Sequence, residues 1–262
     1  MRIQVLTQED AFYIPRILDL LLEKRRDVVG VAIVPGELQA GRVMRFLRMM
    51  GPRDFALQAL NMGWYKLLGL FDGLLAGSHS VAAAAKRRRV PVERVARINA
   101  PEFIASLRER GVDLLISLAC PQKLSPALLA VPGRGAINLH GALLPRYQGI
   151  FPSFWVLAKG ERETGITVHW MDEKLDHGDV LLQRTVAIEP GDTVHSLVRR
   201  SKVDVGRHML LEALERIERG DAPRVPMDMT RASYFTYPDD AAVREFRARA
   251  AQRRPCRTSA VR

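Results

Sequence analysis

The most constraining feature of the sequence is a strand–helix–strand pattern near its start. Residues 2–6 predict a strand, and the apolar positions within residues 14–24 recur with a helical period. The run at residues 28–34, VVGVAIV, is almost continuously β-branched, which is typical of a strand covered on both faces. Strand, helix and strand at this spacing form a βαβ unit. The chain is therefore predicted to be an α/β protein with a mostly parallel sheet flanked by helices.

The same alternation continues beyond this unit and defines the predicted organisation of the chain. We expect helices at 80–88, 100–110, 197–219 and 239–251, strands at 94–97, 113–118, 135–139 and 165–170, and a short hairpin at 232–236. Gly206 is a weak point in the longest of these helices because glycine disfavours a helix interior. The prediction is a domain at 1–200 with a helical insertion at about 41–77, followed by a C-terminal helical and hairpin extension at 201–262.

The segment 55–76 inside the insertion is rich in Leu, Phe, Trp and Met. It is long enough to span a bilayer. Its polar interruptions, which include Lys66 and Asp72, argue against a transmembrane helix. The remaining interpretations are packing on the sheet, a lid, or a subunit contact in a homodimer, and we do not expect a membrane partner.

The formal charge of +11 is unevenly distributed along the chain. Residues 241–262 contain seven Arg and one Glu, so this basic tail supplies more than half of the excess. A second cluster, Lys86 to Arg89, follows an alanine run and resembles the carboxyl end of a helix, where cations complement the helix dipole. The tail is a candidate tRNA contact, and the solvated helix end is the simpler interpretation of the cluster.

The cysteine content and the first ten residues indicate which cellular compartment to expect and whether a structural metal site is expected. Cys120 and Cys256 are far apart and lack metal-ligand spacing, which argues against a disulfide framework or a zinc site. The start, MRIQVLTQED, has no charged leader followed by an apolar stretch. A cytoplasmic location is the expectation.

The first chemically suggestive pattern is Asn138-Leu139-His140, at the end of a predicted strand. Residues two apart in a strand point to one face, so Asn138 and His140 project together. Ligands bind at the carboxyl ends of parallel strands in open α/β sheets. An amide that stabilises a developing negative charge, next to an imidazole that accepts a proton, suits acyl transfer. The alternative is an Asn that caps a turn and a His held by backbone groups.

Two loops, each following a predicted strand, come after this pattern in the sequence. The first, residues 141–149, reads GALLPRYQG, and the second, residues 171–179, reads MDEKLDHGD. The acidic residues of the second loop loosely resemble an EF-hand, but the glycine and the terminal Glu are not where calcium binding requires them. We predict no metal site.

Four motifs follow one another in the second half of the chain: Asn138-Leu139-His140, then Leu143 to Gly149, then Glu163 to His169, then Leu175-Asp176-x-Gly178-Asp179. In this order they resemble the folate-dependent formyltransferases, which include methionyl-tRNA, glycinamide ribonucleotide and amino-sugar formyltransferases. The resemblance covers roughly residues 80–201. It implies a Rossmann-like formyltransferase fold and 10-formyltetrahydrofolate as the formyl donor.

The resemblance also implies roles for individual residues. His140 is expected to act as general base or as a stabilising cation, and Asn138 to hydrogen-bond the formyl oxygen. Asp176 is expected to set the tautomer and pKa of His140; the family pattern favours it over Asp179, which shares its loop. The candidates for the folate pocket are Leu118, Gln122, Leu124, Asp172 and Leu175.

Departures from the family pattern bear on the acceptor. Ala142 stands where the family has Ser, and Gln148 where it has Arg. Glu9 and Asp10 lie in the loop where the glycinamide ribonucleotide enzymes bind phosphate, and they disfavour that substrate. Residues 221–262 are too few for the barrel of methionyl-tRNA formyltransferases.

Three functions remain open at this stage. The first expectation is transfer to a small primary amine, for example a nucleotide-linked amino sugar. The alternative is methionyl-tRNA, whose phosphates the basic residues could neutralise. A further alternative is hydrolysis of 10-formyltetrahydrofolate, although the N-terminal regulatory domain usual for those hydrolases is not apparent.

Overall fold

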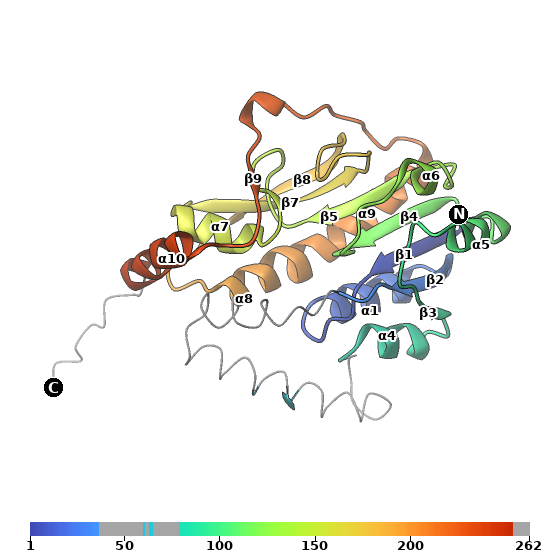
Figure 1. Ribbon diagram of the computed structural model, residues 1–262, viewed down its shortest axis with the longest axis horizontal. Helices are drawn as coiled ribbons and strands as arrows, with labels where there is room; N and C mark the ends of the chain where they lie inside the picture. Colours follow the sequence, from blue (N-terminus) through green and yellow to red (C-terminus); the bar gives the residue numbers. More distant parts are fainter. Residues whose placement is uncertain (37–59, 61–62, 65–78, 254–262) are drawn as a thin grey trace.

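The computed structural model describes residues 1–36, 60, 63–64 and 79–253, and its centre is a seven-stranded sheet (Figure 1). The strand order is β3-β2-β1-β4-β5-β7-β8. The first five of these strands run parallel, and β7 and β8 are antiparallel. The predicted fold class, α/β with a mostly parallel sheet, is confirmed. The strands are β1 Ile3–Thr7, β2 Val28–Ile33, β3 Val92–Arg94, β4 Leu114–Leu118, β5 Ala136–His140, β7 Glu163–Trp170 and β8 Val180–Ala187.

Helices cover both faces of the sheet because each central strand alternates its side chains between two apolar layers. In β1, Ile3 and Val5 join the core cluster that includes α1 (Ile14–Lys24), α4 (Val81–Arg87) and α9 (Arg207–Arg219). Leu6 joins the opposite cluster with α5 (Pro101–Glu109) and α6 (Pro126–Leu129). Figure 1 shows α5 and α6 gathered near the amino ends of the parallel strands.

A third apolar cluster lies beside the sheet. It joins α7 (Pro152–Lys159), α8 (Val194–Val198) and α10 (Asp240–Arg253), and it includes the stacked rings of Phe154 and Phe246, whose centroids are 4.8 Å apart. Helix α9 contributes Met209, Leu210, Ala213, Leu214 and Ile217 to the sheet core. The region predicted as a C-terminal extension thus supplies buried residues to two of the three clusters.

Three sequence predictions are wrong in detail. The strand predicted at 94–97 lies at Val92–Arg94, where it forms the edge of the sheet beside β2. The helix predicted at 197–219 starts at Val194 and is interrupted by a π-helical segment, Arg199–Gly206, so the weak point at Gly206 marks the end of that segment. The hairpin predicted at 232–236 is instead a short strand, β9 (Tyr234–Phe235), parallel to β6 (Gln148–Gly149). Its partner is distant in sequence, so local turn signals could not reveal it.

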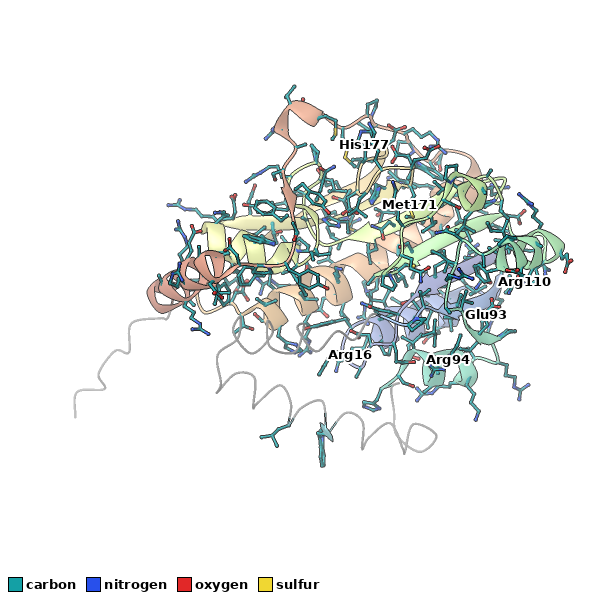
Figure 2. The ribbon with its side chains drawn as sticks, in the orientation of Figure 1. Arg16, Glu93, Arg94, Arg110, Met171 and His177 are labelled. Carbon is teal, nitrogen blue, oxygen red and sulfur yellow. The ribbon has the colours of Figure 1, made fainter. Side chains whose placement is uncertain are left out.

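Polar contacts of Arg110 link the end of α5 to strands β3 and β1. Arg110 at the end of α5 pairs with Glu93 of β3 at 2.9 Å, and both are labelled in Figure 2. Arg110 also donates to Gln4 of β1 at 3.2 Å. The helical insertion predicted at 41–77, with its apolar segment 55–76, lies outside the described residues except for residues 60 and 63–64. Within the described ranges, no helix is both long and apolar enough to cross a membrane.

Candidate active site

The candidate site is built around β5, at the junction of the parallel and antiparallel halves of the sheet. Asn138 and His140 share the face of β5 that also presents Ala136. Strand β7 runs antiparallel beside β5 and places His169 opposite Asn138 and Thr167 opposite His140. The strand therefore ends with two polar side chains on one face, as the sequence pattern predicts.

Asp176 reaches the same place from the loop between β7 and β8. Because β7 is antiparallel to β5, this loop starts at the amino end of β5 and folds back along the strand; Figure 2 labels Met171 and His177, near its two ends. Asp176 Oδ1 lies 3.4 Å from His140 Nδ1. Asp176 Oδ2 accepts a hydrogen bond from Gly149 N at 2.9 Å, and Gln148 Nε2 donates to the Asp176 carbonyl at 2.8 Å. The structure thus brings Asn138, His140 and Asp176 together.

The hydrogen bonds define the tautomer of His140. Its Nε2 lies 2.9 Å from the carbonyl oxygen of Tyr147, and a carbonyl can only accept, so Nε2 carries the hydrogen. In the neutral ring, Nδ1 then holds the lone pair, and this atom faces Asp176. Nδ1 is therefore the proton acceptor, and its protonated form would be paired at once with a carboxylate.

Asn138 is held from two sides. Its Nδ2 lies 3.1 Å from His169 Nε2 and donates to Asp176 Oδ1 at 3.3 Å. His169 Nδ1 lies 2.9 Å from the Trp170 carbonyl, so Nδ1 carries the hydrogen and Nε2 accepts. Both amide hydrogens of Asn138 are engaged, and the longer bond, to Asp176, is the weaker of the two.

Burial and neighbouring charges determine the protonation states of His140 and Asp176. His140 is 5% exposed, and this burial lowers its pKa despite the opposing effect of Asp176. Burial opposes ionisation of Asp176, but His140, His169 and the amide of Gly149 outweigh it and hold the pKa of that carboxyl well below its usual range. At neutral pH the site holds a neutral imidazole beside an ionised carboxylate.

Backbone strain gathers around this edge of the sheet. Ala119 after β4, Tyr147 and Phe151 after β5, and Asp176 after β7 all adopt positive φ. Such conformations cost non-glycine residues free energy and often occur at functional sites. Of the five non-glycine residues with positive φ in the described ranges, four therefore lie at the carboxyl end of β4 or in the segments around His140, and the fifth, Arg89, follows α4.

The candidates for the folate pocket are in different environments. Leu118 and Leu124 are each 2% exposed within the apolar core, and Gln122 uses its amide to hold the backbone at Ala96 and Ile98. Asp172 binds His177 Nδ1 at 2.6 Å, whereas Leu175 is 44% exposed beside Asp176. The structure therefore brings Leu175, but not the side chains of Leu118 and Leu124, to an open surface.

The acidic residues after β1 have structural partners. Asp10 Oδ1 accepts from the amides of Phe12, Tyr13 and Ile14 at the start of α1, at 2.6–3.1 Å. Glu9 accepts from the amide of Val81 at 2.8 Å, at the start of α4. Two helix N-termini that could bind a phosphate are thus occupied by carboxylates of the chain itself.

Two residues near the site were not singled out by the sequence. His169 lies in a strand motif that suggested no role for it, and only the register of β5 and β7 places it against Asn138. Lys202 comes from the π-helical segment, far along the chain, and reaches the backbone that follows His140. Within the described ranges, no group of His, Cys, Asp and Glu has the arrangement of a metal site.

Comparison with known families agrees with this geometry. A family model described as formyl transferase matches residues 1–214, and the chain belongs to this family. The methionyl-tRNA formyltransferase of Symbiobacterium thermophilum is 36% identical over 197 residues, covering 71% of this chain and 60% of the relative. That of Anaeromyxobacter sp. (strain K) is 42% identical over 151 residues, covering 58% and 48%. The chain spans about half the length of the curated relatives it matches.

Solved structures confirm the formyltransferase fold. The N-formyltransferase from Helicobacter canadensis, in complex with folinic acid and dTDP-3-aminofucose, aligns with a TM-score of 0.60 at 17% identity, over 90% of this chain and 71% of that one. Glycinamide ribonucleotide transformylase 1 from Symbiobacterium toebii aligns with a TM-score of 0.57 at 23% identity, over 84% and 88%. At these identities the likeness concerns the fold.

Proposed function

We propose that the chain transfers a formyl group from 10-formyltetrahydrofolate to a primary amine. The observation that carries the proposal is the arrangement of His140 and Asp176, in which the lone pair of a neutral imidazole faces a buried carboxylate at 3.4 Å. Attack by an amine on a formyl carbon requires a base for the proton of the amine and a donor for the charge that develops on oxygen. His140 and Asn138 provide these two groups on one strand face.

10-Formyltetrahydrofolate would supply the reactive formyl carbon. The exposed Leu175 offers an apolar contact for a flat donor, and the positive φ at Ala119 marks a strained backbone in the loop after β4. We assign its binding to the loops at 119–124 and 172–175. Leu118, Leu124 and Gln122 would then support the first loop from beneath, through the core and through the backbone at Ala96 and Ile98.

The residues of the chain have separate tasks in the proposed reaction. His140 Nδ1 takes the proton of the attacking nitrogen, and Asp176 stabilises the imidazolium that results. The imidazolium would then give this proton to N10 of the donor as the bond between the formyl carbon and N10 breaks, so that tetrahydrofolate leaves as a neutral amine and His140 becomes neutral again. Asn138 gives up its 3.3 Å bond to Asp176 and turns that hydrogen toward the formyl oxygen, while His169 keeps the other hydrogen. Gly149 N continues to hold the second oxygen of Asp176, so the carboxylate stays in place.

The acceptor we propose first is a small amine such as a nucleotide-linked amino sugar, the kind of molecule bound by the Helicobacter canadensis neighbour. The carboxylates of Glu9 and Asp10 already fill the helix N-termini after β1. A phosphate placed directly against these termini is therefore disfavoured, and a nucleotide-linked acceptor would have to bind its phosphates elsewhere.

Methionyl-tRNA is the second candidate acceptor. It is favoured by the relatives named methionyl-tRNA formyltransferase, which are 36–42% identical over the matched region. The exposed cations Lys86 and Arg89 at the end of α4 are candidates for phosphate contacts.

An amine panel tests the proposal. The purified chain is mixed with 10-formyltetrahydrofolate and, separately, an amino sugar, a nucleotide-linked amino sugar, methionyl-tRNA, or no acceptor. Tetrahydrofolate and formylated product are both quantified. We expect them to appear in equal amounts with one acceptor class. Tetrahydrofolate released without any formylated product would instead favour the hydrolase alternative.

A further inference from the structure

Lys202 occupies an unusual position at the edge of the site. It belongs to the π-helical segment Arg199–Gly206 that links α8 to α9, and its neighbours Ser201 and Val203 are buried while its own side chain is half-buried. Insertions of π-helix change the direction in which the following side chains point, and they are frequent at functional sites. The position of Lys202 in a π-helical interruption therefore suggests a functional role for its side chain.

The side chain of Lys202 lies over the backbone that follows His140. A Cβ added to Gly141 would lie 2.7 Å from Lys202 Cε, so the end of the lysine side chain lies directly against the backbone at Gly141. Segment Arg199–Gly206 packs against α1, β5 and β7, which places it on the core face opposite His140. Lys202 thus reaches around the carboxyl end of β5 from the other face.

The charged groups around Lys202 come from several elements. Asp176 acts on it from the β7–β8 loop and Asp10 from the β1–α1 loop, while His140 experiences its charge from β5. On the packed elements, His169 of β7 acts on Asp176 and also lowers the pKa of His140, and Arg16 of α1 acts on His195 of α8. Burial lowers the pKa of Lys202, and the two carboxylates oppose this effect.

Neither carboxylate forms an ion pair with the lysine. Asp10 accepts from three amides at the start of α1, and Asp176 accepts from Gly149 and Asn138. In the part of the chain that the structure describes, no hydrogen bond or ion pair uses Lys202 Nζ. Among the described residues, the ammonium beside the site therefore has no hydrogen-bond acceptor.

We propose that Lys202 is a positioning residue that faces the incoming acceptor and selects an uncharged amine. This inference rests on the proposed function. An amine attacks only through its lone pair, and a fixed cation nearby disfavours the protonated form. The same cation favours neutral His140, so that base and nucleophile reach the reaction in the forms it requires.

The test compares Lys202→Met with Lys202→Arg and with the control Lys24→Met, an exposed lysine at the end of α1. The dependence of kcat on pH is measured with saturating substrates because it reports the groups of the bound complex. For Lys202→Met we expect the acid limb to move to higher pH by about one pH unit. Lys202→Arg and Lys24→Met should keep the wild-type profile. A Lys202→Met enzyme that is slower by the same factor at every pH would overturn the proposal.

A second measurement does not depend on catalysis. The titration of the His140 ring is followed by NMR in the free protein, with its signal assigned from a His140→Asn variant. Lys202→Met should raise the midpoint, and an unchanged midpoint would contradict the inference. Lys202→Gln serves in both measurements if the Met variant does not fold. If no amine is formylated by the wild-type chain, the proposed function fails, while this titration still decides whether Lys202 acts on His140.

Discussion

At the scale of single residues, the groups that contact the two ring nitrogens of His140 determine its chemistry. The Tyr147 carbonyl fixes the hydrogen on Nε2, and Asp176 faces Nδ1 at 3.4 Å. Burial lowers the pKa of His140, so the ring is already neutral below the ordinary histidine value of about 6.5. We expect activity to persist below that pH and to be lost as the pH falls through the lowered pKa of the ring.

Asp176→Asn tests this arrangement because it removes the charge without changing the shape. The asparagine cannot stabilise the imidazolium, so kcat should fall by roughly 10²–10⁴-fold. The lost carboxylate had raised the pKa of His140, so that pKa should decrease further and the acid limb should move to lower pH. Rate profiles from pH 5 to 8 check both effects. An acid limb that moves to higher pH would contradict the assignment.

The residue types of the site were predictable, but some of their partners were not. Strand periodicity placed Asn138 and His140 on one face, and the structure has them there. The choice of Asp176 over Asp179 depended on family resemblance, since both lie in one loop. His169 and Lys202 could not be found from periodicity because their proximity depends on an antiparallel register and on a π-helical segment.

At the scale of elements, the short pair β6–β9 links the C-terminal region to the site. Strand β9 packs on Gln148 and Gly149, whose side chain and amide hold Asp176. Gly149 has φ +95°, and a Cβ there would lie 2.0 Å from the Phe235 carbonyl. The pairing therefore requires glycine, and a chain segment distant in sequence supports the carboxylate.

Three glycine substitutions separate the effect of backbone strain on stability from the effect of a clash with β9. Gly149→Ala should destabilise the protein by roughly 1–3 kcal/mol and lower kcat, because it combines backbone strain with a clash against β9. Gly220→Ala has positive φ but no atom within 4 Å of the added Cβ, and Gly133→Ala has neither problem. We expect a smaller loss of stability for Gly220→Ala, little for Gly133→Ala, and unchanged kcat in both. Denaturant unfolding and kcat measurements check the order; a Gly149→Ala variant with normal kcat would refute the link.

Elements that are determined by their local sequence were predicted well, and elements that depend on a partner distant in the sequence were not. The helix at Ile14–Lys24 matched its prediction to the residue, because one apolar face determines it. The strand β9 was mispredicted as part of a hairpin, because its partner is β6, far away in sequence. The end of the sheet at β7 and β8 is antiparallel, a feature that a βαβ pattern does not specify.

At the scale of the whole molecule, the basic cluster Lys86 to Arg89 lies at the end of α4, and the described part of the basic tail belongs to the fold. Ala242 and Val243 of α10 are buried beside α7, so removing residues 241–262 would disturb a core cluster. A test of nucleic-acid binding must therefore keep α10. Substituting the exposed Lys86 and Arg89 at the end of α4 avoids this difficulty.

Salt dependence distinguishes the two acceptors. If methionyl-tRNA is the acceptor, its binding should weaken steeply between 50 and 200 mM salt, by roughly 10³-fold or more for six phosphate contacts. Lys86→Gln with Arg89→Gln should weaken binding and flatten this slope. Formylation of an amino sugar should show no comparable slope. Fluorescence anisotropy with labelled tRNA makes the measurement, and binding that is indifferent to salt would exclude the tRNA interpretation.

The most direct test of the central claim is the single-turnover rate of formyl transfer in His140→Ala, measured with the acceptor that the amine panel identifies. Far-ultraviolet circular dichroism and the denaturant midpoint establish that the variant is folded. The account predicts a loss of roughly 10²–10⁴-fold, because the imidazole base that takes the proton of the amine is then missing. A folded His140→Ala variant that transfers the formyl group at the wild-type rate would contradict it.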